Sequence, residues 1–188
     1  GGDLVGGQEG NDTILGGNEN DALYGERGND LLLGGTGNDL LVGGRGSDIL
    51  FGGTESDNLL GNQGNDLIDG GTGDDILGGG NGNDTLTGGS GNDIFAGGNG
   101  NDLIHGGANN DIIWGEDGDD TITGGEGSDN IAPGAGADRI NLGTGTSTIA
   151  GWFKGVDVFG ISQEGLEFSD LTITDPINAQ ITRNDTGA

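Results

Sequence analysis

Aspartate recurs along this chain at a spacing that could place many carboxylates in one regular array. Sixteen aspartates follow one another at an unbroken period of nine residues. They are Asp3, Asp12, Asp21, Asp30, Asp39, Asp48, Asp57, Asp66, Asp75, Asp84, Asp93, Asp102, Asp111, Asp120, Asp129 and Asp138. Carboxylate and carbonyl oxygens are the ligands that Ca²⁺ selects, and the sequence has no His or Cys cluster that would favour zinc. The array therefore predicts repeated calcium sites.

Two other positions keep the same phase as the aspartates. A large apolar residue stands two positions after each one, from Val5 to Ile140, and Gly stands five positions before it in fourteen of fifteen loops, with Pro133 the exception. The net charge of −27, from 32 acidic and 5 basic residues, would otherwise indicate disorder. Three positions held in phase indicate a structural repeat instead.

The nine-residue unit divides into a turn and a strand. The six residues that end at the aspartate, such as 34–39, predict a turn with exposed carbonyl oxygens, because Gly accepts positive φ and Asn tolerates it. The next three, such as 40–42, predict a short strand whose middle side chain points inward. Two units then close one coil, and sixteen units form about eight coils, roughly 40 Å long.

The unit resembles the RTX, or hemolysin-type, calcium-binding repeat Gly-Gly-x-Gly-x-Asp-x-U-x, where U is a large apolar residue. Residues 43–51 and 97–105 match this pattern fully, and the resemblance covers residues 1 to about 141. It implies an all-β fold: a right-handed parallel β-roll with two short parallel sheets and 18 residues per coil. We assign residues 1–141 to the roll and 142–188, with half of the chain's aromatic residues, to a small β-rich cap.

The resemblance also implies where calcium binds. In this family Ca²⁺ lies between loops eighteen residues apart, held by both Asp side chains and by Gly-rich backbone carbonyls. Asp21 would pair with Asp39, and Asp30 with Asp48. The expected glycine ligands are Gly35, Gly37, Gly44, Gly46, Gly71, Gly73, Gly80, Gly82, Gly89, Gly91, Gly98 and Gly100. We expect roughly 10–14 ions. A dozen would change the net charge from −27 to about −3, so we expect calcium removal to unfold the roll.

The aspartates separate into two rows. Row A contains Asp3 and every eighteenth residue after it, and row B contains Asp12 and every eighteenth residue after it. In row A the Gly two positions before the aspartate is replaced by Glu19, Glu55 and Asn109, and in row B the Gly four positions before it is replaced by Gln8, Glu26, Asn62 and Glu116. These loops either have altered coordination, with Glu adding a ligand or screening a neighbour, or reflect neutral drift where only the carbonyl binds.

Outward strand positions in the first third of the chain are apolar. At eighteen-residue spacing, one sheet would stack Leu15, Leu33 and Phe51, and the other Tyr24, Val42 and Leu60. Beyond residue 68 the corresponding residues become smaller or more polar. This stripe predicts a partner, such as another domain, another copy or a cell-surface layer. The preference of strands for aliphatic residues is the alternative explanation.

Several function classes do not fit the sequence. The strong negative charge disfavours nucleic-acid binding, and no apolar run approaches the roughly 20 residues of a membrane span. His105 is the only histidine and belongs to an outward strand position, so we expect no catalytic activity from this chain. The chain opens within a repeat, without a signal-peptide pattern, so we expect a longer parent protein that could carry a catalytic domain upstream.

Three functions remain open. The first is a calcium-dependent folding module of a secreted or cell-surface bacterial protein, exported by type I secretion and placed outside the cell. The second is a structural surface, filament or S-layer-like protein, which the apolar stripe favours. The third is an ice-binding adhesin segment, suggested by the row Thr36, Thr54, Thr72 and Ser90, which Glu55 interrupts.

Overall fold

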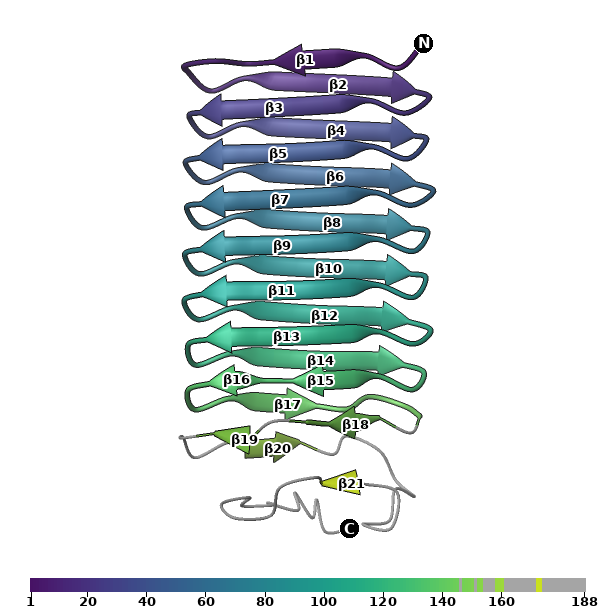
Figure 1. Cartoon of the computed structure of the whole chain (residues 1–188), viewed down its shortest axis with the longest axis vertical. Coiled ribbons are helices and arrows are strands. Elements are labelled where there is room, and N and C mark those ends of the chain that lie inside the picture. The colour runs from purple at the N-terminus through teal and green to yellow at the C-terminus, as the bar shows by residue number, and fades with distance from the viewer. Residues whose placement is uncertain (146, 151, 154–157, 161–171, 174–188) are drawn as a thin grey trace, which may run out of the picture.

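The chain winds into a solenoid of parallel strands (Figure 1). The computed structural model describes the backbone of residues 1–145, 147–150, 152–153, 158–160 and 172–173. Up to Phe153, strands pair at a spacing of eighteen residues, as in Leu41↔Leu59, so two nine-residue units complete one coil. All pairings between named strands are parallel, and none of the described residues is helical, which confirms the expected all-β parallel roll.

Two sheets stand back to back, and consecutive strands alternate between them. Sheet A runs in the order β1 (Leu4–Gly6), β3 (Ala22–Arg27), β5 (Leu40–Arg45), β7 (Asn58–Gln63), β9 (Ile76–Asn81), β11 (Ile94–Asn99), β13 (Ile112–Asp117), β15 (Asn130–Ala132), β18 (Thr148–Ile149) and β21 (Thr172–Ile173), with β16 (Gly134–Ala135) joining β13 to β19 (Trp152–Phe153). Sheet B runs in the order β2 (Thr13–Asn18), β4 (Leu31–Thr36), β6 (Ile49–Thr54), β8 (Leu67–Thr72), β10 (Thr85–Ser90), β12 (Leu103–Ala108), β14 (Thr121–Glu126), β17 (Arg139–Asn141) and β20 (Val158–Gly160).

The strands are longer than the sequence predicted. The expected unit had a three-residue strand and a six-residue turn, but β5 continues through Gly43, Gly44 and Arg45, so the turn shrinks to residues 46–48. The Gly-Gly pairs stay in the ladder because each lies in register with its counterpart one coil away, as in Gly35↔Gly53. Close stacking of bare backbone replaces the side-chain packing that normally marks a strand.

The core consists of two stacked rows of apolar side chains, one row from each sheet. The second residue of each strand from β2 to β15 points inward, and Leu23, Leu41 and Phe95 have no exposed surface. The buried apolar set is Ile14, Leu23, Leu32, Leu41, Leu50, Leu59, Ile68, Leu77, Leu86, Phe95, Ile104, Ile113, Ile122, Ile131, Ile140, Leu142 and Ile149. The predicted inward positions are confirmed. Because only one side chain per strand fills this core, the aspartates at its margins stay close to bare backbone.

The outer faces stay apolar farther along the chain than the sequence suggested. Exposed fractions of 46% for Ile76, 48% for Leu103 and 43% for Trp114 show that large apolar residues continue well beyond residue 68. The expectation that the stripe fades there is therefore wrong for these positions. Ile76 and Leu103 are the first residues of their strands, whereas the expectation beyond residue 68 rested on third residues. Trp114 is itself a third residue, so it contradicts that expectation directly.

Strand pairing continues past residue 141. Thr148 pairs with Asn130 in sheet A, and Phe159 pairs with Ile140 in sheet B. The division between roll and cap at residue 141 stays a prediction. Within the predicted β-rich cap, residues 146, 151, 154–157, 161–171 and 174–188 lie outside the described residues. No helix among the described residues is long and apolar enough to cross a membrane.

A neighbouring pair of substitutions tests the inward register. Leu86 is fully buried, whereas Thr87 points outward from the same strand. In saturating calcium we expect Leu86→Ala to lower the free energy of unfolding by about 2–5 kcal/mol through cavity formation. Thr87→Ala should change it by less than about 0.5 kcal/mol. Denaturant titration checks both values, and equal effects of the two substitutions would contradict this register.

Candidate metal sites

The two aspartate rows lie at opposite edges of the roll, in the turns that connect the sheets. Asp21 follows β2 and precedes β3, whereas Asp30 follows β3 and precedes β4. The turns at the left and right margins of Figure 1 hold these rows. Every row member from Asp21 to Asp138 is at most 4% exposed. Such burial is unusual for a carboxylate and requires partners of opposite charge or hydrogen-bond donors.

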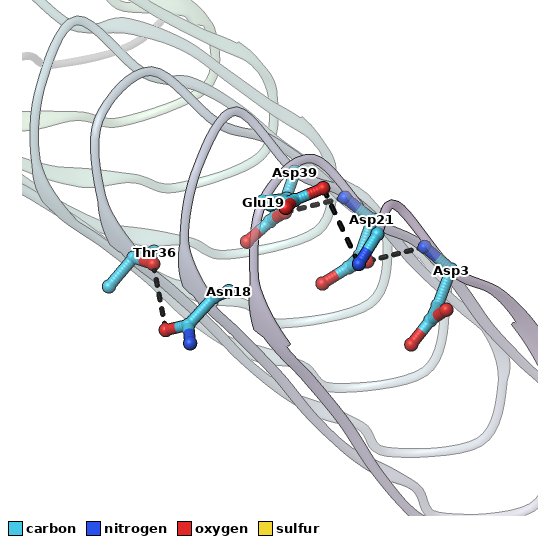
Figure 2. A network of polar contacts seen from close by, with 7 residues as sticks. Asp3, Asn18, Glu19, Asp21, Thr36 and Asp39 are labelled. Carbon is cyan, nitrogen blue, oxygen red and sulfur yellow. Dashed lines mark hydrogen bonds and ion pairs between the residues drawn. The ribbon is translucent and has the colours of Figure 1, made fainter.

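One carboxylate oxygen of each row aspartate from Asp21 to Asp138 accepts a hydrogen bond from the backbone of the preceding coil. The backbone N–H of Asp21 donates to Oδ1 of Asp39 over 2.8 Å, and that of Asp30 donates to Oδ1 of Asp48 over 2.8 Å. Figure 2 shows the start of row A, where Asp3, Asp21 and Asp39 are joined in this way. The same bond, 2.6–3.1 Å long, recurs through both rows to Asp138. The structure thus brings the predicted pairs together.

The other carboxylate oxygen, Oδ2, lacks a protein donor. In each of the thirteen row members from Asp12 to Asp120, Oδ2 is buried and accepts no hydrogen bond. A buried polar atom without a partner costs free energy, and an unpaired buried charge costs several kcal/mol. Because the same oxygen is unpaired in thirteen aspartates, we infer that all thirteen Oδ2 atoms bind the same kind of partner, which must be a proton or a cation.

A backbone carbonyl approaches the same space as Oδ2. A methyl group built on Gly16 would lie 2.6 Å from Oδ2 of Asp21 and 2.7 Å from the carbonyl oxygen of Gly34. At Gly97 the corresponding distances are 2.5 Å to Asp102 and 2.7 Å to Gly115. The two oxygens therefore lie within bridging reach of one cation whose bonds are about 2.3–2.6 Å long. Only Gly leaves this space open.

The oxygen-only donor set fits calcium. Among the residues that the structure describes, no three His, Cys, Asp or Glu side chains are grouped closely enough to hold a metal by themselves. One or two carboxylates would therefore act with backbone carbonyls, which suits a hard cation with six to eight oxygen ligands. Buried Oδ2 atoms and converging carbonyl oxygens meet that requirement.

The sequence did not single out the glycines whose carbonyls approach Oδ2. It assigned metal binding to glycines four and two positions before each aspartate. All twelve of those have φ between 104° and 141° and shape the turns, and their role as ligands stays a prediction. The carbonyl beside Oδ2 comes from the next coil, from the glycine five positions before that coil's aspartate. Gly34 thus approaches Oδ2 of Asp21, and Gly52 approaches Oδ2 of Asp39. The signal was present, because this is the Gly found in fourteen of fifteen loops.

The seven replaced glycines keep a left-handed backbone. Gln8, Glu19, Glu26, Glu55, Asn62, Asn109 and Glu116 are the only non-Gly residues with positive φ in the described chain, at 73–83°. At Glu55 the side chain compensates: its Oε2 accepts hydrogen bonds from the Thr54 hydroxyl and the Gly37 N–H, at 2.6 and 2.9 Å. These bonds hold the pKa of Glu55 below its usual value. Whether calcium occupancy differs at these loops stays a prediction.

A second polar ladder runs outside the aspartates, and the sequence analysis missed it. The N–H of Asn29 donates to Oδ1 of Asn11, and that of Ser47 donates to Oδ1 of Asn29. The residue before each row aspartate continues this pattern in both rows, over 2.7–3.2 Å. These bonds point toward the N-terminal coil, opposite to the aspartate ladder. Each turn is therefore tied in both directions, which explains the Asn, Ser and Asp residues at this position.

Burial raises the pKa of the row aspartates from Asp39 to Asp129. The pKa values of Asp57, Asp66, Asp102 and Asp111 rise to about 7, and those of Asp93 and Asp120 to about 6. Desolvation is the main cause, the charge of neighbouring acidic residues adds to it, and the backbone hydrogen bond to Oδ1 opposes it. Without a metal, these groups therefore tend to bind protons near neutral pH.

Adjacent glycines provide a direct test of the proposed metal site between Oδ2 and the glycine carbonyl. A methyl group on Gly79 would collide with Oδ2 of Asp84 and lie 2.6 Å from the carbonyl oxygen of Gly97. A methyl group on Gly78 would point outward, 3.0 Å from the flexible end of Leu60. We expect Gly79→Ala to lower the number of bound calcium ions by one or two, because each turn faces the turns on both sides. Calorimetric titration measures this number, which Gly78→Ala should leave unchanged. An unchanged number of bound calcium ions in Gly79→Ala would contradict a metal site beside Oδ2 of Asp84.

The raised pKa values predict an unusual pH dependence without metal. Because the folded chain binds protons more tightly than the unfolded chain, whose aspartates have a pKa of 3.8, stability falls as pH rises from about 4 to about 7. In chelator, the circular dichroism signal for β structure should therefore be stronger near pH 5 than near pH 8. In calcium the trend should reverse, since protons compete for Oδ2. A metal-free roll that gains no structure on acidification would contradict this assignment.

Comparison with known families agrees with this geometry. A model of the RTX calcium-binding nonapeptide repeat, written as four copies, matches the chain in overlapping stretches, the first over residues 6–41 and the last over residues 114–149. Together the matches run from residue 6 to residue 149, well over half of the chain. A search among curated proteins finds no match. The chain therefore belongs to the RTX calcium-binding repeat family, and its β-roll is a calcium-binding module.

Proposed function

We propose that calcium binding between successive turns drives this roll to fold and then holds it folded outside the cell. The observation that carries the proposal is the buried, unpartnered Oδ2 repeated from Asp12 to Asp120. When bound, calcium would supply positive charge between stacked carboxylates. Row aspartates, joined by carbonyls such as those of Gly34 and Gly52, would hold it, and the Gly-rich turns keep that space open.

Charge supports a coupling between calcium and folding. The chain carries −27, and its row carboxylates stack one coil apart at both edges. The aliphatic core contributes one side chain per strand, so little hydrophobic burial opposes this repulsion. A cation that binds the folded chain alone adds its binding free energy to stability. Calcium at 10–14 sites would neutralise most of the charge.

The proposed location outside the cell follows from the same coupling between calcium binding and folding. Extracellular calcium modules bind with dissociation constants of about 10⁻⁴–10⁻³ M, so a roll of this kind would fold only where calcium is abundant. A chain kept unfolded inside the cell suits export, and we therefore place the module in a secreted or cell-surface bacterial protein, with type I secretion as the route. The segment 142–188 would close the end of the roll, because an open solenoid end exposes its core.

A structural role at the cell surface is the second candidate. Leu15, Ile49, Phe51 and Leu67 lie on neighbouring strands of sheet B and are 37–66% exposed. A contiguous apolar patch of this kind favours contact with a partner. Light scattering of the calcium-loaded chain separates assembly from a purely monomeric folding module.

The ice-binding alternative has less support. Thr36, Thr54, Thr72 and Ser90 do lie in register at the ends of neighbouring strands and are exposed. Two of the four hydroxyls are already bonded within the chain, since Thr36 donates to Asn18 and Thr54 donates to Glu55. Thermal hysteresis in calcium would support ice binding, and its absence would remove that alternative.

Calcium removal tests the proposed function directly. With excess chelator at pH 8, we expect the β signal in circular dichroism to disappear, and calcium should restore it in one cooperative transition. Magnesium at the same concentration should fail, because it demands octahedral geometry and retains its water. A metal-free chain that remains rich in β structure at pH 8 would contradict the proposal.

A further inference from the structure

The outer face of sheet A lacks charge across its two main columns of side chains. The first and third residues of each strand point outward, and from β1 to β15 they make sixteen positions, none of which is acidic, basic or His. One residue in five is charged in the whole chain. Leu4, Ile76 and Trp114 are 78, 46 and 43% exposed on this face. A broad, uncharged and apolar face on such an acidic chain indicates a contact surface.

Charge limits what could cover this face. The row carboxylates lie at the edges of the roll, so any partner on the face meets them only at its rim. Calcium in the two rows would neutralise most of that rim charge, so the partner must be flat and uncharged over the same length. A second copy of the chain meets both conditions, because it presents the same face with the same coil spacing, and this step rests on the proposed calcium binding.

The face is also complementary to itself. The fifth residue of each strand forms a third outward column beside the other two. Strands that begin with a large residue, Leu40, Ile76 or Ile94, have Gly in this column. A twofold axis along the roll, through the middle column, would place each large residue of one copy opposite a glycine of the other.

The other strands of sheet A pair the two columns differently. The strand that begins with Asn58 has Asn62 in the third column, and the one that begins with the small Ala22 has Glu26 there. Two large first residues have no glycine opposite them: β13 begins with Ile112 and has Glu116 in the third column, and β1 begins with Leu4 and has Gln8 at the corresponding position. On a twofold axis Glu26 and Glu116 would lie at opposite rims in the two copies, where water screens them.

Sheet B does not offer the same fit. Its middle column contains Asp69 and His105, so a twofold axis there would bring each of them against its own counterpart. Like charges placed together at an interface are unfavourable. Sheet B therefore serves as an internal control for sheet A.

The size of sheet A suits a stable dimer. Strands of six residues are about 20 Å long, the three-residue strands β1 and β15 are about half as long, and the eight strands from β1 to β15 extend over about 38 Å. The face thus measures roughly 670 Å², within the roughly 600–1,000 Å² that each partner contributes to a standard interface. We propose that two copies of this chain pack face to face through the outer surface of sheet A, about a twofold axis parallel to the roll.

Two matched substitutions test this interface in the full chain with saturating calcium. Ile76 and Leu67 begin successive strands on opposite faces and are 46 and 40% exposed. Sedimentation velocity at about 10–100 μM should show a dimer for the unmodified chain. Ile76→Glu should raise the dissociation constant by about 100-fold or more, because it introduces an unpaired charge into the contact. Leu67→Glu should leave the dimer intact.

Circular dichroism in calcium reports folding separately from association. If Ile76→Glu fails to fold, Ile76→Thr replaces it, since sheet B already has Thr at the same strand position in Thr85 and Thr121. Loss of the dimer in the folded sheet A variant alone supports the interface. A monomeric unmodified chain, a dimer insensitive to the sheet A substitution, or loss of association in both variants would overturn it.

Discussion

The buried carboxylate is the constraint on which the rest of this roll depends. Each row aspartate from Asp21 to Asp138 uses Oδ1 to accept a backbone N–H from the preceding coil, and this bond helps to fix the rise from one coil to the next. From Asp12 to Asp120, Oδ2 lies in a space with no protein donor. A fold that gains its register from a carboxylate thus creates a requirement for positive charge at each of these turns. Calcium meets this requirement with backbone oxygens that are already in place.

Glycine makes the arrangement sterically possible at two distinct places. Beside the carboxylate, a side chain on Gly16 or Gly97 would occupy the space between the converging oxygens. In the turn itself, Gly46 has a φ of 122°, and a methyl group there would collide with the backbone of Gly28 one coil earlier. The first requirement concerns ligand space and the second concerns coil spacing. Where Gln, Glu or Asn replaces a glycine of the repeat, φ falls to 73–83°, compared with 122° at Gly46. The glycine beside the carboxylate is replaced only by Pro133 in the loops before a row aspartate.

Much of the fold could be predicted from the sequence, because the nine-residue period determines which residues point inward and how many units form one coil. The inward residues, such as Leu41 and Ile104, follow from the apolar phase, and the pairing of Asp21 with Asp39 follows from the resemblance to the RTX repeat. Strand length could not be predicted, because the ladder through Gly43 and Gly44 depends on backbone stacking rather than on side chains with high strand propensity. The approach of the Gly34 carbonyl to Asp21 was also hidden, since a pattern of residue types does not specify where a carbonyl points.

The central claim is that calcium occupies the space between stacked turns, next to Oδ2 and the carbonyl of the glycine five residues before an aspartate. Anomalous diffraction from crystals grown in calcium tests it most directly, because it locates each ion without assumptions about the protein. If calcium binds next to Oδ2, the map will contain two lines of peaks along opposite edges of the roll, each peak about 2.3–2.6 Å from Oδ2 of a row aspartate. Peaks confined to the outer ladder of Asn, Ser and Asp residues, with Oδ2 left unligated, would contradict it.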